Sequence, residues 1–268
     1  MKERGLPCKG EMVNAILAGK KDQTRRLASH FNNMHFPKFS VFGKGNDWPK
    51  LRVRNDISGF PDNPDMVVKA GNYPFLLSMQ DLSVMAKTTY GYVKLADMDY
   101  TLISPYGEAG DKLWVREAWR TISNFDSMTP KEMAKSCLAA GYKEPWGPIK
   151  YECDGKKLNF ENMDACDREV GRYRHARFMP KWASRLKLEI IEVRLERLNQ
   201  ISEQDALNEG FIKLNSGRVV LNQGDQYLGN YWHTAKAAFK DLWEILHGEN
   251  SWKDNPVVWV IKFKREGD

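Results

Sequence analysis

The chain has 268 residues, of which 42% are hydrophobic and 12% aromatic, and its 41 basic and 35 acidic side chains give a formal net charge of +6. This length suits one large domain or a core domain that carries insertions, and the aromatic content argues against a disordered chain. No apolar run approaches the ~20 residues that span a bilayer. Residues 1–5 lack an apolar signal region, so we expect a cytoplasmic protein with no membrane partner.

The basic excess suits a nucleic-acid partner, although an excess this modest does not require one. Basic residues are concentrated near the start of the chain, where the first 30 residues hold seven bases against three acids. A solvated basic surface explains the same pattern. The seven bases are Lys2, Arg4, Lys9, Lys20, Lys21, Arg25 and Arg26.

The four cysteines form no C-x-x-C pair, and no histidine lies at zinc-finger spacing from them. We therefore expect free thiols in a reducing compartment, and no metal or cofactor. A long-range metal site formed by Cys153, Cys166 and His175 is the alternative. The other two cysteines are Cys8 and Cys137.

The first predicted element is a short amphipathic helix over residues 11–18, with Gly19 as its C-cap. We expect the following residues, 19–26, to turn into a loop. Lysines 20 and 21 suit this place because the end of a helix dipole favours cations.

The middle of the chain is predicted to carry two loop-rich insertions, over residues 31–100 and 122–177. The first contains turn-forming residues at 60–65 and 71–74. Between the insertions, residues 112–117 alternate as a strand with Leu113 and Val115 on one face. The second insertion contains one predicted helix over residues 129–140.

The last third of the chain predicts two strands and two helices. Residues 185–198 alternate as a strand whose phase slips by one residue, as at a β-bulge or a barrel corner. Residues 202–205 match a capping box, and the short helix that starts there ends near Glu209 with Gly210 as C-cap. A longer amphipathic helix over 234–246 and a strand over 257–264 follow. The predicted fold class is α+β.

The motif with most possible chemistry is G-x-K-x-x-T-x-R, formed by Gly19, Lys21, Thr24 and Arg26. A lysine near a threonine hydroxyl can activate it for attack, and an arginine beside them can hold a phosphate or a polarised carbonyl. The alternative is that Lys21 and Thr24 are ordinary surface loop residues.

Four motifs in order resemble the ASCH domain: the G-x-K-x-x-T-x-R motif after a short helix, a Gly-Asp turn leading into a strand at 110–117, a capped helix that ends in glutamate, and a terminal V-x-W-V-I-x-F strand. ASCH domains belong to a PUA-like β-barrel superfamily associated with RNA. The longer chain here is similar to ASCH proteins of phages and prophages through residues 105–117, 179–185 and 241–244.

The resemblance implies a single ASCH-like domain over residues 1–268, a small β-barrel with short helices. Its core would consist of residues 1–30, 104–120 and 178–264. The insertions 31–100 and 122–177 carry no match.

Small members of this superfamily are N4-acetylcytidine amidohydrolases, in which the motif lysine, the motif threonine and a downstream glutamate carry the reaction. The resemblance therefore implies Lys21, Thr24 and Glu209 as catalytic residues, with Glu203 as the alternative glutamate. Thr24 would be the nucleophile, Lys21 its base and Glu209 the acid. Arg26 would stabilise an oxyanion or hold a phosphate.

The further substrate-binding candidates are two tryptophans and two arginines. Trp114 and Trp182 would stack on a base, while Arg116 and Arg185 would contact phosphates. Alternatively Trp182 belongs to the core, and the two arginines pair with Glu117 or Glu189. The full set of predicted binding residues is Gly19, Arg26, Trp114, Arg116, Trp182 and Arg185.

These features predict a protein that recognises a modified nucleoside or a nucleic acid, RNA rather than DNA. The leading function is removal of the N4-acyl group of acetylated cytidine, without a metal. The alternatives are a non-catalytic RNA- or DNA-binding module that reads a modified base and, third, a metal-dependent ribonuclease. The oligomeric state is left open.

Overall fold

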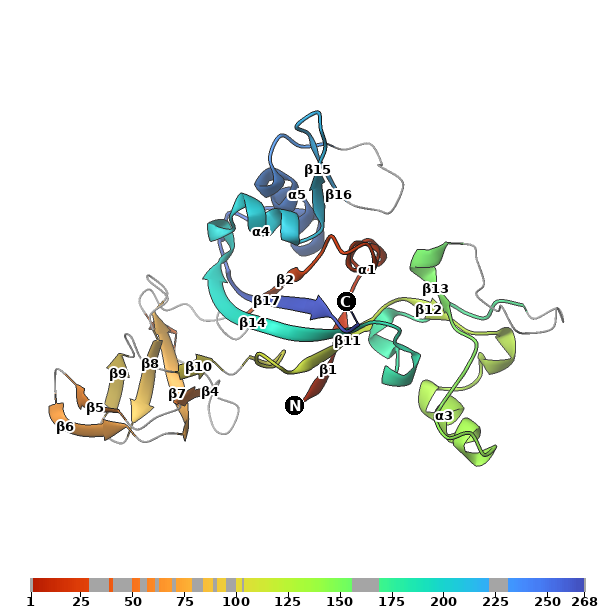
Figure 1. Cartoon of the computed structure of the whole chain (residues 1–268), viewed down its shortest axis with the longest axis horizontal. Coiled ribbons are helices and arrows are strands. Elements are labelled where there is room, and N and C mark those ends of the chain that lie inside the picture. The colour runs from red at the N-terminus through yellow and green to blue at the C-terminus, as the bar shows by residue number, and fades with distance from the viewer. Residues whose placement is uncertain are drawn as a thin grey trace.

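The computed structural model describes residues 2–28, 104–155, 169–221 and 231–267 and, between residues 39 and 102, the backbone of β-strands only. Its central element is a five-stranded mixed sheet with the order β1-β11-β14-β17-β2 (Figure 1). β1 pairs with β11 in parallel, and the other pairs are antiparallel. The strands are β1 (Glu3–Pro7), β11 (Lys112–Arg116), β14 (Lys187–Arg197), β17 (Val257–Arg265) and β2 (Gln23–Leu27).

The sheet is curved but open. β14 and β17 bend together in Figure 1, yet no pairing joins the edge strands β1 and β2 within the described residues. The mixed α and β composition predicted from the sequence is confirmed, whereas these strands do not form a closed barrel. One consequence is that β2 keeps a free edge.

The bend of β14 coincides with a β-bulge. The register with β17 shifts between Ile190 and Glu192, where the alternation of apolar residues slips by one. A bulge adds a residue to one strand and increases its local bend. The predicted phase slip is therefore confirmed, and both Ile190 before the bulge and Val193 after it pack in the same apolar cluster.

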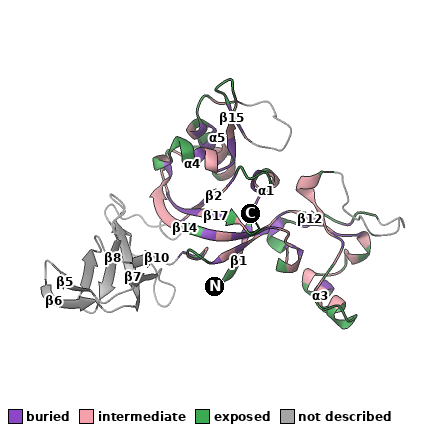
Figure 2. Cartoon of the chain, in the orientation of Figure 1, coloured by how far each residue is buried: buried purple, intermediate pink, exposed green. Residues whose placement is uncertain are grey.

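The central sheet contributes to two such clusters, and Figure 2 shows the buried residues concentrated along its strands. The first cluster packs helix α1 (Gly10–Leu17) through Val13 and Ile16 against β11, β14 and the end of β17. The second packs α5 (Ala235–His247) and the hairpin of β15 (Phe211–Lys213) and β16 (Val219–Leu221) against Val258 and Val260. Between them the clusters enclose the sheet edge that carries the sequence motif.

The helices begin where side-chain caps predict. Thr129 accepts a hydrogen bond from the backbone of Glu132 and starts α3 (Pro130–Ala139). Ser202 likewise accepts one from the backbone of Asp205 and starts α4 (Glu203–Asn208), and Thr234 starts α5. Such caps satisfy N–H groups that have no partner inside the helix. The predicted helices are confirmed to within one or two residues.

Segment 104–155 also forms a third apolar cluster beside the sheet. It is centred on Trp119, which is fully buried in β12 (Trp119–Arg120) and meets the edge of Trp182 at a centroid distance of 6.4 Å. β12 pairs with β13 (Lys150–Tyr151). The cluster also contains Met133 of α3, so it joins the predicted insertion to residues 119 and 179–183 on either side of it.

The described backbone of the first predicted insertion consists of β-strands. Its described backbone forms a six-stranded sheet, in which β10-β4-β7-β8-β9 are consecutive and β3 pairs with β7, and a separate β5–β6 pair. Pro64 and Pro74, which favoured turns in the sequence, lie within strands. The strands are β3 (Phe39–Ser40), β4 (Lys50–Val53), β5 (Ile57–Phe60), β6 (Asn63–Val68), β7 (Gly71–Ser78), β8 (Val84–Thr88), β9 (Gly91–Lys94) and β10 (Tyr100–Leu102).

Candidate functional site

The G-x-K-x-x-T-x-R motif is a helix end followed by a buried strand. Gly19, with φ of +64°, ends α1, and the chain then enters β2. Thr24 is 2% exposed and Arg25 is 5% exposed. The loop expected for residues 19–26 is therefore wrong beyond residue 22, because pairing with β17 extends the chain.

Lys21 and Glu209 form a buried ion pair. The Nζ atom of Lys21 donates to Oε2 of Glu209 at 2.7 Å and to its backbone oxygen at 2.8 Å. The exposed fractions of the two side chains are 1% and 4%. Ion pairs this deeply buried are stable only when both partners are present and their remaining polar atoms are bonded.

Backbone contacts hold this pair in place. The N–H of Lys21 donates to Ala15 of α1, and the N–H of Asp22 donates to Asn208 at the end of α4. Gly210 follows with φ of +110°, and a Cβ atom there would lie 3.0 Å from the Cβ of Ala15. Only glycine suits both that conformation and that approach, so α4 ends directly against α1 and Lys21.

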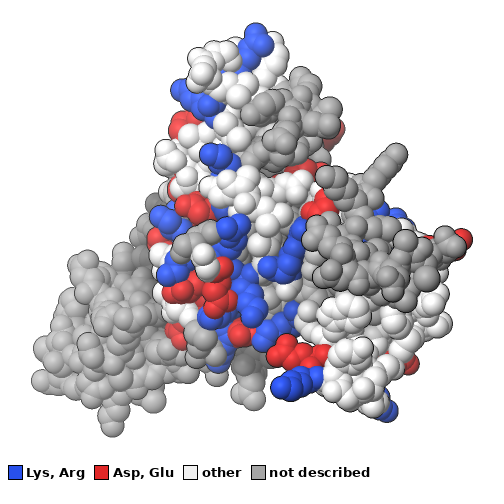
Figure 3. All heavy atoms as spheres, turned by 45° about the vertical axis from the view of Figure 1, so that its right-hand side comes forward, with Lys and Arg blue, Asp and Glu red and all other residues white. Residues whose placement is uncertain are grey.

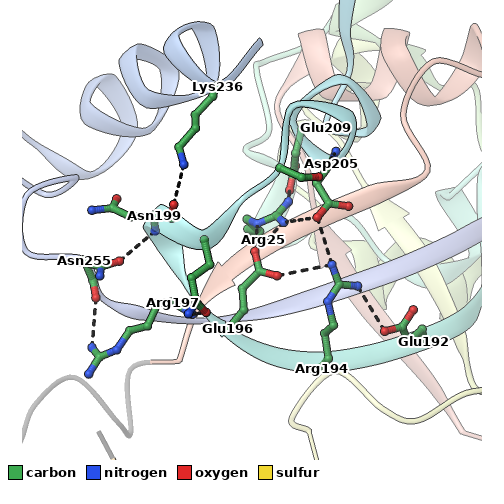
Figure 4. A network of polar contacts seen from close by, with 12 residues as sticks. Arg25, Glu192, Arg194, Glu196, Arg197, Asn199, Asp205, Glu209, Lys236 and Asn255 are labelled. Carbon is green, nitrogen blue, oxygen red and sulfur yellow. Dashed lines mark hydrogen bonds and ion pairs between the residues drawn. The ribbon is translucent and has the colours of Figure 1, made fainter. Parts of the chain in front are cut away.

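Arg25 is the centre of the polar network around the pair (Figure 4). Its Nη1 atom donates to Oε1 of Glu209 at 3.1 Å, so Glu209 accepts from two cations. Nε and Nη2 donate to Oε1 of Glu196 at 2.8 and 2.6 Å, and Nη2 also reaches Asp205 at 3.3 Å. The side chain of Arg25 is fully buried. This arginine orients the Glu209 carboxylate.

The network continues to the surface through Arg194. Its Nη2 atom lies 3.3 Å from Asp205 and 3.4 Å from Glu196, and its Nη1 atom donates to Glu192 at 3.2 Å. Figure 4 shows these groups between Glu192 on β14 and Glu209 at the end of α4. Through Arg25, these contacts hold the carboxylate oxygen of Glu209 that Lys21 does not contact.

Two adjoining cavities lie beside this group. The smaller, of about 70 Å³, is lined by Lys21, Thr24, Arg25 and Arg26 together with α5 residues that include Trp243 and His247. The larger, of about 250 Å³, is lined by the start of α1, the β15–β16 hairpin and α5. Both are lined by Met12, Glu209, Leu242 and Leu246. Glu209 therefore lies at the junction between them.

The smaller cavity follows the free edge of β2, since four consecutive residues of that strand line it. The backbone N–H of Ala28 donates to the carbonyl of Val257, and the N–H of Phe263 donates to the carbonyl of Asp22. The even-numbered residues of β2 therefore point their backbone N–H and C=O groups toward β17. Hydrogen-bonding pairs alternate along an antiparallel strand, and the backbone N–H and C=O of Arg25 therefore point outward. By the same alternation, the backbone N–H and C=O of Leu27, which also lines the cavity, point away from β17.

The walls of the larger cavity are mainly apolar and aromatic. Phe211 and Trp232 meet edge to face with ring centroids 6.2 Å apart, and Val220 and Leu221 line the same space. The Nε1 atom of Trp232 donates to Asp241 at 2.7 Å, which fixes the indole. Apolar walls with a few convergent polar groups are typical of small-molecule sites.

The structure brings together the three predicted catalytic residues. Lys21, Thr24 and Glu209 all line the smaller cavity, and the Thr24 hydroxyl has no hydrogen-bond partner in the described part of the chain. Glu203, the alternative glutamate, accepts from the backbone N–H groups of Ala235 and Lys236 and caps α5 instead. Glu209, and not Glu203, therefore lies in the cavity with Lys21 and Thr24.

Arg26 also lines this cavity, as predicted for a binding residue. Its Nη2 atom donates to the backbone oxygen of Pro7 at 2.6 Å and lies 3.9 Å from the sulfur of Cys8. Burial raises the pKa of the Cys8 thiol, which therefore stays protonated at neutral pH. Gly19, by contrast, does not line either cavity.

The remaining predicted binding residues lie elsewhere. Trp114 and Arg116 stack on each other on β11, with the guanidinium 4.4 Å from the ring centroid. Trp182 packs in the third apolar cluster. Arg185 pairs with Glu117 and Asp154, at 2.9 and 2.7 Å. The structural alternatives for Trp182 and Arg185 are thus confirmed, and none of the four lines either cavity.

The charges of the protein are unevenly spread. Figure 3 shows lysine and arginine side chains gathered in the middle of one face and interrupted by acidic groups. Among the described residues, no group of three or more His, Cys, Asp and Glu side chains is placed to hold a metal ion, and no helix is long and apolar enough to cross a membrane. Cys8, Cys137 and Cys153 are free thiols, and Cys166 lies outside the described residues.

No protein-family model, curated protein or solved structure matches the chain. Membership of the ASCH family therefore stays a prediction that rests on the sequence motifs. The site is defined by its own geometry: a buried Lys21–Glu209 pair, a threonine hydroxyl and two adjoining cavities.

Proposed function

We propose that this protein binds an N4-acylated cytosine nucleoside in the two cavities and hydrolyses its amide bond. The observation that carries the proposal is the position of Glu209, which lines both cavities, whereas Lys21 and Thr24 line only the smaller one. An acylated base has the matching layout: a flat ring, a small acyl group and an amide nitrogen between them.

In this arrangement the base ring occupies the larger cavity against Phe211 and Trp232. The acyl group enters the smaller cavity beside Thr24, and the amide nitrogen lies near Glu209. Stacking on aromatic side chains is the usual way in which proteins hold an unpaired base. The outward N–H and C=O of Arg25 would complement polar atoms of the bound amide.

The reaction follows from the ion pair. Lys21 passes a proton along the 2.7 Å hydrogen bond to Glu209 and, as a neutral amine, accepts the proton of the Thr24 hydroxyl. The hydroxyl oxygen attacks the acyl carbon, the carbon–nitrogen bond breaks, and Glu209 protonates the departing amine. Water then hydrolyses the acyl ester on Thr24, which releases the carboxylic acid and restores the hydroxyl.

Arg25 acts here as a positioning residue. It holds Oε1 of Glu209 at 3.1 Å and leaves Oε2 for Lys21. Its own bonds to Glu196 and Asp205 keep it in place. A carboxylate that exchanges a proton with Lys21 thereby keeps one orientation throughout the cycle.

The proposal also includes a fold family and a cellular location. A strongly curved sheet with short helices over its free edge is compatible with a PUA-like ASCH domain that has opened around its insertions. We place it in the cytoplasm with RNA-derived nucleosides or RNA as its partner, as the family resemblance implies.

The test is incubation of the purified full-length protein with N4-acetylcytidine, other N4-acyl cytidines and unmodified nucleosides, followed by mass spectrometry. The proposal predicts cytidine and acetate, in equal amounts, with and without a chelator. Lys20→Ala, which changes the exposed neighbour of Lys21, is the matched control and retains the activity. Unchanged N4-acetylcytidine would overturn the hydrolase, and RNA cleavage abolished by the chelator would favour a ribonuclease.

A second function, binding of a modified base without turnover, is favoured by one observation. The ammonium of Lys21 already donates to two oxygens of Glu209, so the pair also serves as a brace that holds the wall of the cavity. This function predicts saturable binding of the acylated nucleoside in calorimetry and no release of acetate.

A further inference from the structure

Three basic side chains line the two adjoining cavities. Arg26 lies on β2, His247 at the end of α5, and Lys9 directly before α1. Arg26 and His247 line the smaller cavity, and Lys9 lines the larger one next to it. Lys9 and His247 are exposed, whereas Arg26 is partly buried. The three residues come from separate parts of the chain, and Glu209 lines both of the cavities that they line.

The three side chains are close enough to interact electrostatically. His247 stacks on Trp243 at a centroid distance of 4.1 Å. The contact with Trp243 removes water from part of the imidazole. This desolvation, together with the charges of Arg26 and Lys9, lowers the pKa of His247. Like charges held together in this way repel one another, and a bound anion relieves the repulsion.

Arg26 has no acidic partner within the described ranges. Its Nη2 atom contacts only the backbone oxygen of Pro7 and the sulfur of Cys8, and its Nε atom is buried without a hydrogen-bond partner. The neighbouring Arg25, in contrast, pairs with three carboxylates. A partly buried guanidinium with an unused N–H group is suited to a phosphate oxygen.

We propose that Arg26, Lys9 and His247 form a phosphate subsite, so that the ligand of the adjoining cavities is a phosphorylated nucleoside rather than a free one. This inference rests on the proposed function, because it takes the base to lie in the larger cavity with its acyl group in the smaller one. Arg26 binds the phosphate through paired N–H groups, Lys9 adds a mobile positive charge and His247 donates a ring N–H. Two acidic residues line the cavities: Glu209 accepts hydrogen bonds from Lys21 and Arg25, and Glu11 is exposed and lines only the larger cavity.

Calorimetry with the full chain tests the subsite. The probes are cytidine, cytidine 5′-monophosphate, cytidine 3′-monophosphate and a short cytidine-containing oligonucleotide, at low salt. We expect at least one phosphorylated probe to bind about 10-fold or more tightly than cytidine, since each additional 1.4 kcal/mol corresponds to tenfold affinity. A preference for the monophosphate identifies a free nucleotide as ligand, and a preference for the oligonucleotide identifies a strand.

Variants assign the preference to the three residues. Arg26→Gln, Lys9→Gln and His247→Gln should each lower the ratio of phosphorylated to unphosphorylated affinity, with Arg26→Gln lowering it most. Lys20→Gln removes an equivalent charge from an exposed position that lines neither cavity, and should leave the ratio unchanged. Lys9 and His247 are exposed, so their variants fold even if Arg26→Gln does not.

The outcomes separate this inference from the proposed function. Equal affinity for cytidine and all phosphorylated probes would overturn the phosphate subsite and leave the nucleoside function intact. No binding of any phosphorylated probe would overturn the phosphate subsite, whereas the proposed function is decided separately by the hydrolysis of N4-acetylcytidine. A phosphate preference that survives all three substitutions would show that the phosphate is bound elsewhere on the protein, and would overturn the assignment.

Discussion

Lys21 and Glu209 are 188 positions apart in the chain, yet the ammonium of one lies 2.7 Å from the carboxylate of the other in the interior. The contact joins the chain just before β2 to the residue that follows α4. It exists because Gly210 lets α4 end against α1 and because Arg25 holds the opposite carboxylate oxygen. The proposed chemistry depends on this contact.

Breaking the pair should destabilise the protein. We expect Lys21→Met and Glu209→Gln each to lower the free energy of unfolding by about 3 kcal/mol, because each leaves a polar group buried without its charged partner. The double variant should lose less than the sum of the two losses, by about 1 kcal/mol or more. Urea unfolding followed by circular dichroism measures both quantities.

The control for this cycle is Lys20→Met. Lys20 is exposed beside Lys21, so its substitution should change the free energy of unfolding by no more than about 0.5 kcal/mol. Additive losses in the double variant would contradict a direct Lys21–Glu209 interaction.

Gly210→Ala should be more harmful than Gly217→Ala. Both glycines have positive φ, of +110° and +80°, but only the Cβ at position 210 would meet a neighbour, at 3.0 Å from Ala15. We expect Gly217→Ala to cost about 1 kcal/mol and Gly210→Ala at least about 1 kcal/mol more. The midpoints of thermal unfolding compare the two. Equal midpoints would show that the approach of α4 to α1 does not need a glycine.

Arg25→Lys should weaken both stability and ligand binding although it keeps the charge. Lysine cannot reproduce the fork that contacts Glu196, Asp205 and Glu209 at once. We expect a loss of about 2 kcal/mol in the free energy of unfolding, and a larger loss for Arg25→Met, which leaves the carboxylates without this partner. Arg194→Lys, nearer the surface, is the matched control and should lose less. A fully stable Arg25→Lys variant would rule out a positioning role.

The pKa of His247 should lie below 6.5 in the folded protein and rise in the Arg26→Gln and Lys9→Gln variants. Between the folded pKa and 6.5 the unfolded chain binds more protons, so stability rises with pH across that window. Below the folded pKa the unfavourable contribution of His247 is complete, and it disappears as the pH rises through 6.5. Proton NMR titration of the imidazole measures the shift, and a pKa unchanged by both substitutions would show that the cations do not face this ring.

Local sequence signals predicted most elements of the central fold. The apolar phase slip in residues 185–198 marked the bulge of β14, and Thr129, Ser202 and Thr234 capped the expected helices. These signals succeed because a bulge and a cap each depend on residues that are neighbours in the chain. The end of α4 at Glu209 and Gly210 was predicted for the same reason.

The parts that the sequence did not reveal depend on distant contacts. Arg25 lies in a strand, where alternation says that neighbours point to opposite faces but not which face is covered, so nothing marked it as buried. Trp182 and Arg185 looked like binding residues because their partners, Trp119, Glu117 and Asp154, are far away in the chain. In segment 39–102, the turn-forming residues Pro64 and Pro74 lie within strands β6 and β7 because these strands pair with β5 and β4.

The most direct test of the central claim compares N4-acetylcytidine hydrolysis by the unmodified protein, Thr24→Ser and Thr24→Val. We predict that Thr24→Ser retains activity, that Thr24→Val loses at least about 10³-fold in kcat, and that acid-quenched unmodified protein carries one acetyl group on the peptide that contains Thr24. Valine is close to threonine in shape, and circular dichroism is the check that the Thr24→Val variant folds. Hydrolysis by folded Thr24→Val at the rate of the unmodified protein would contradict the proposed mechanism.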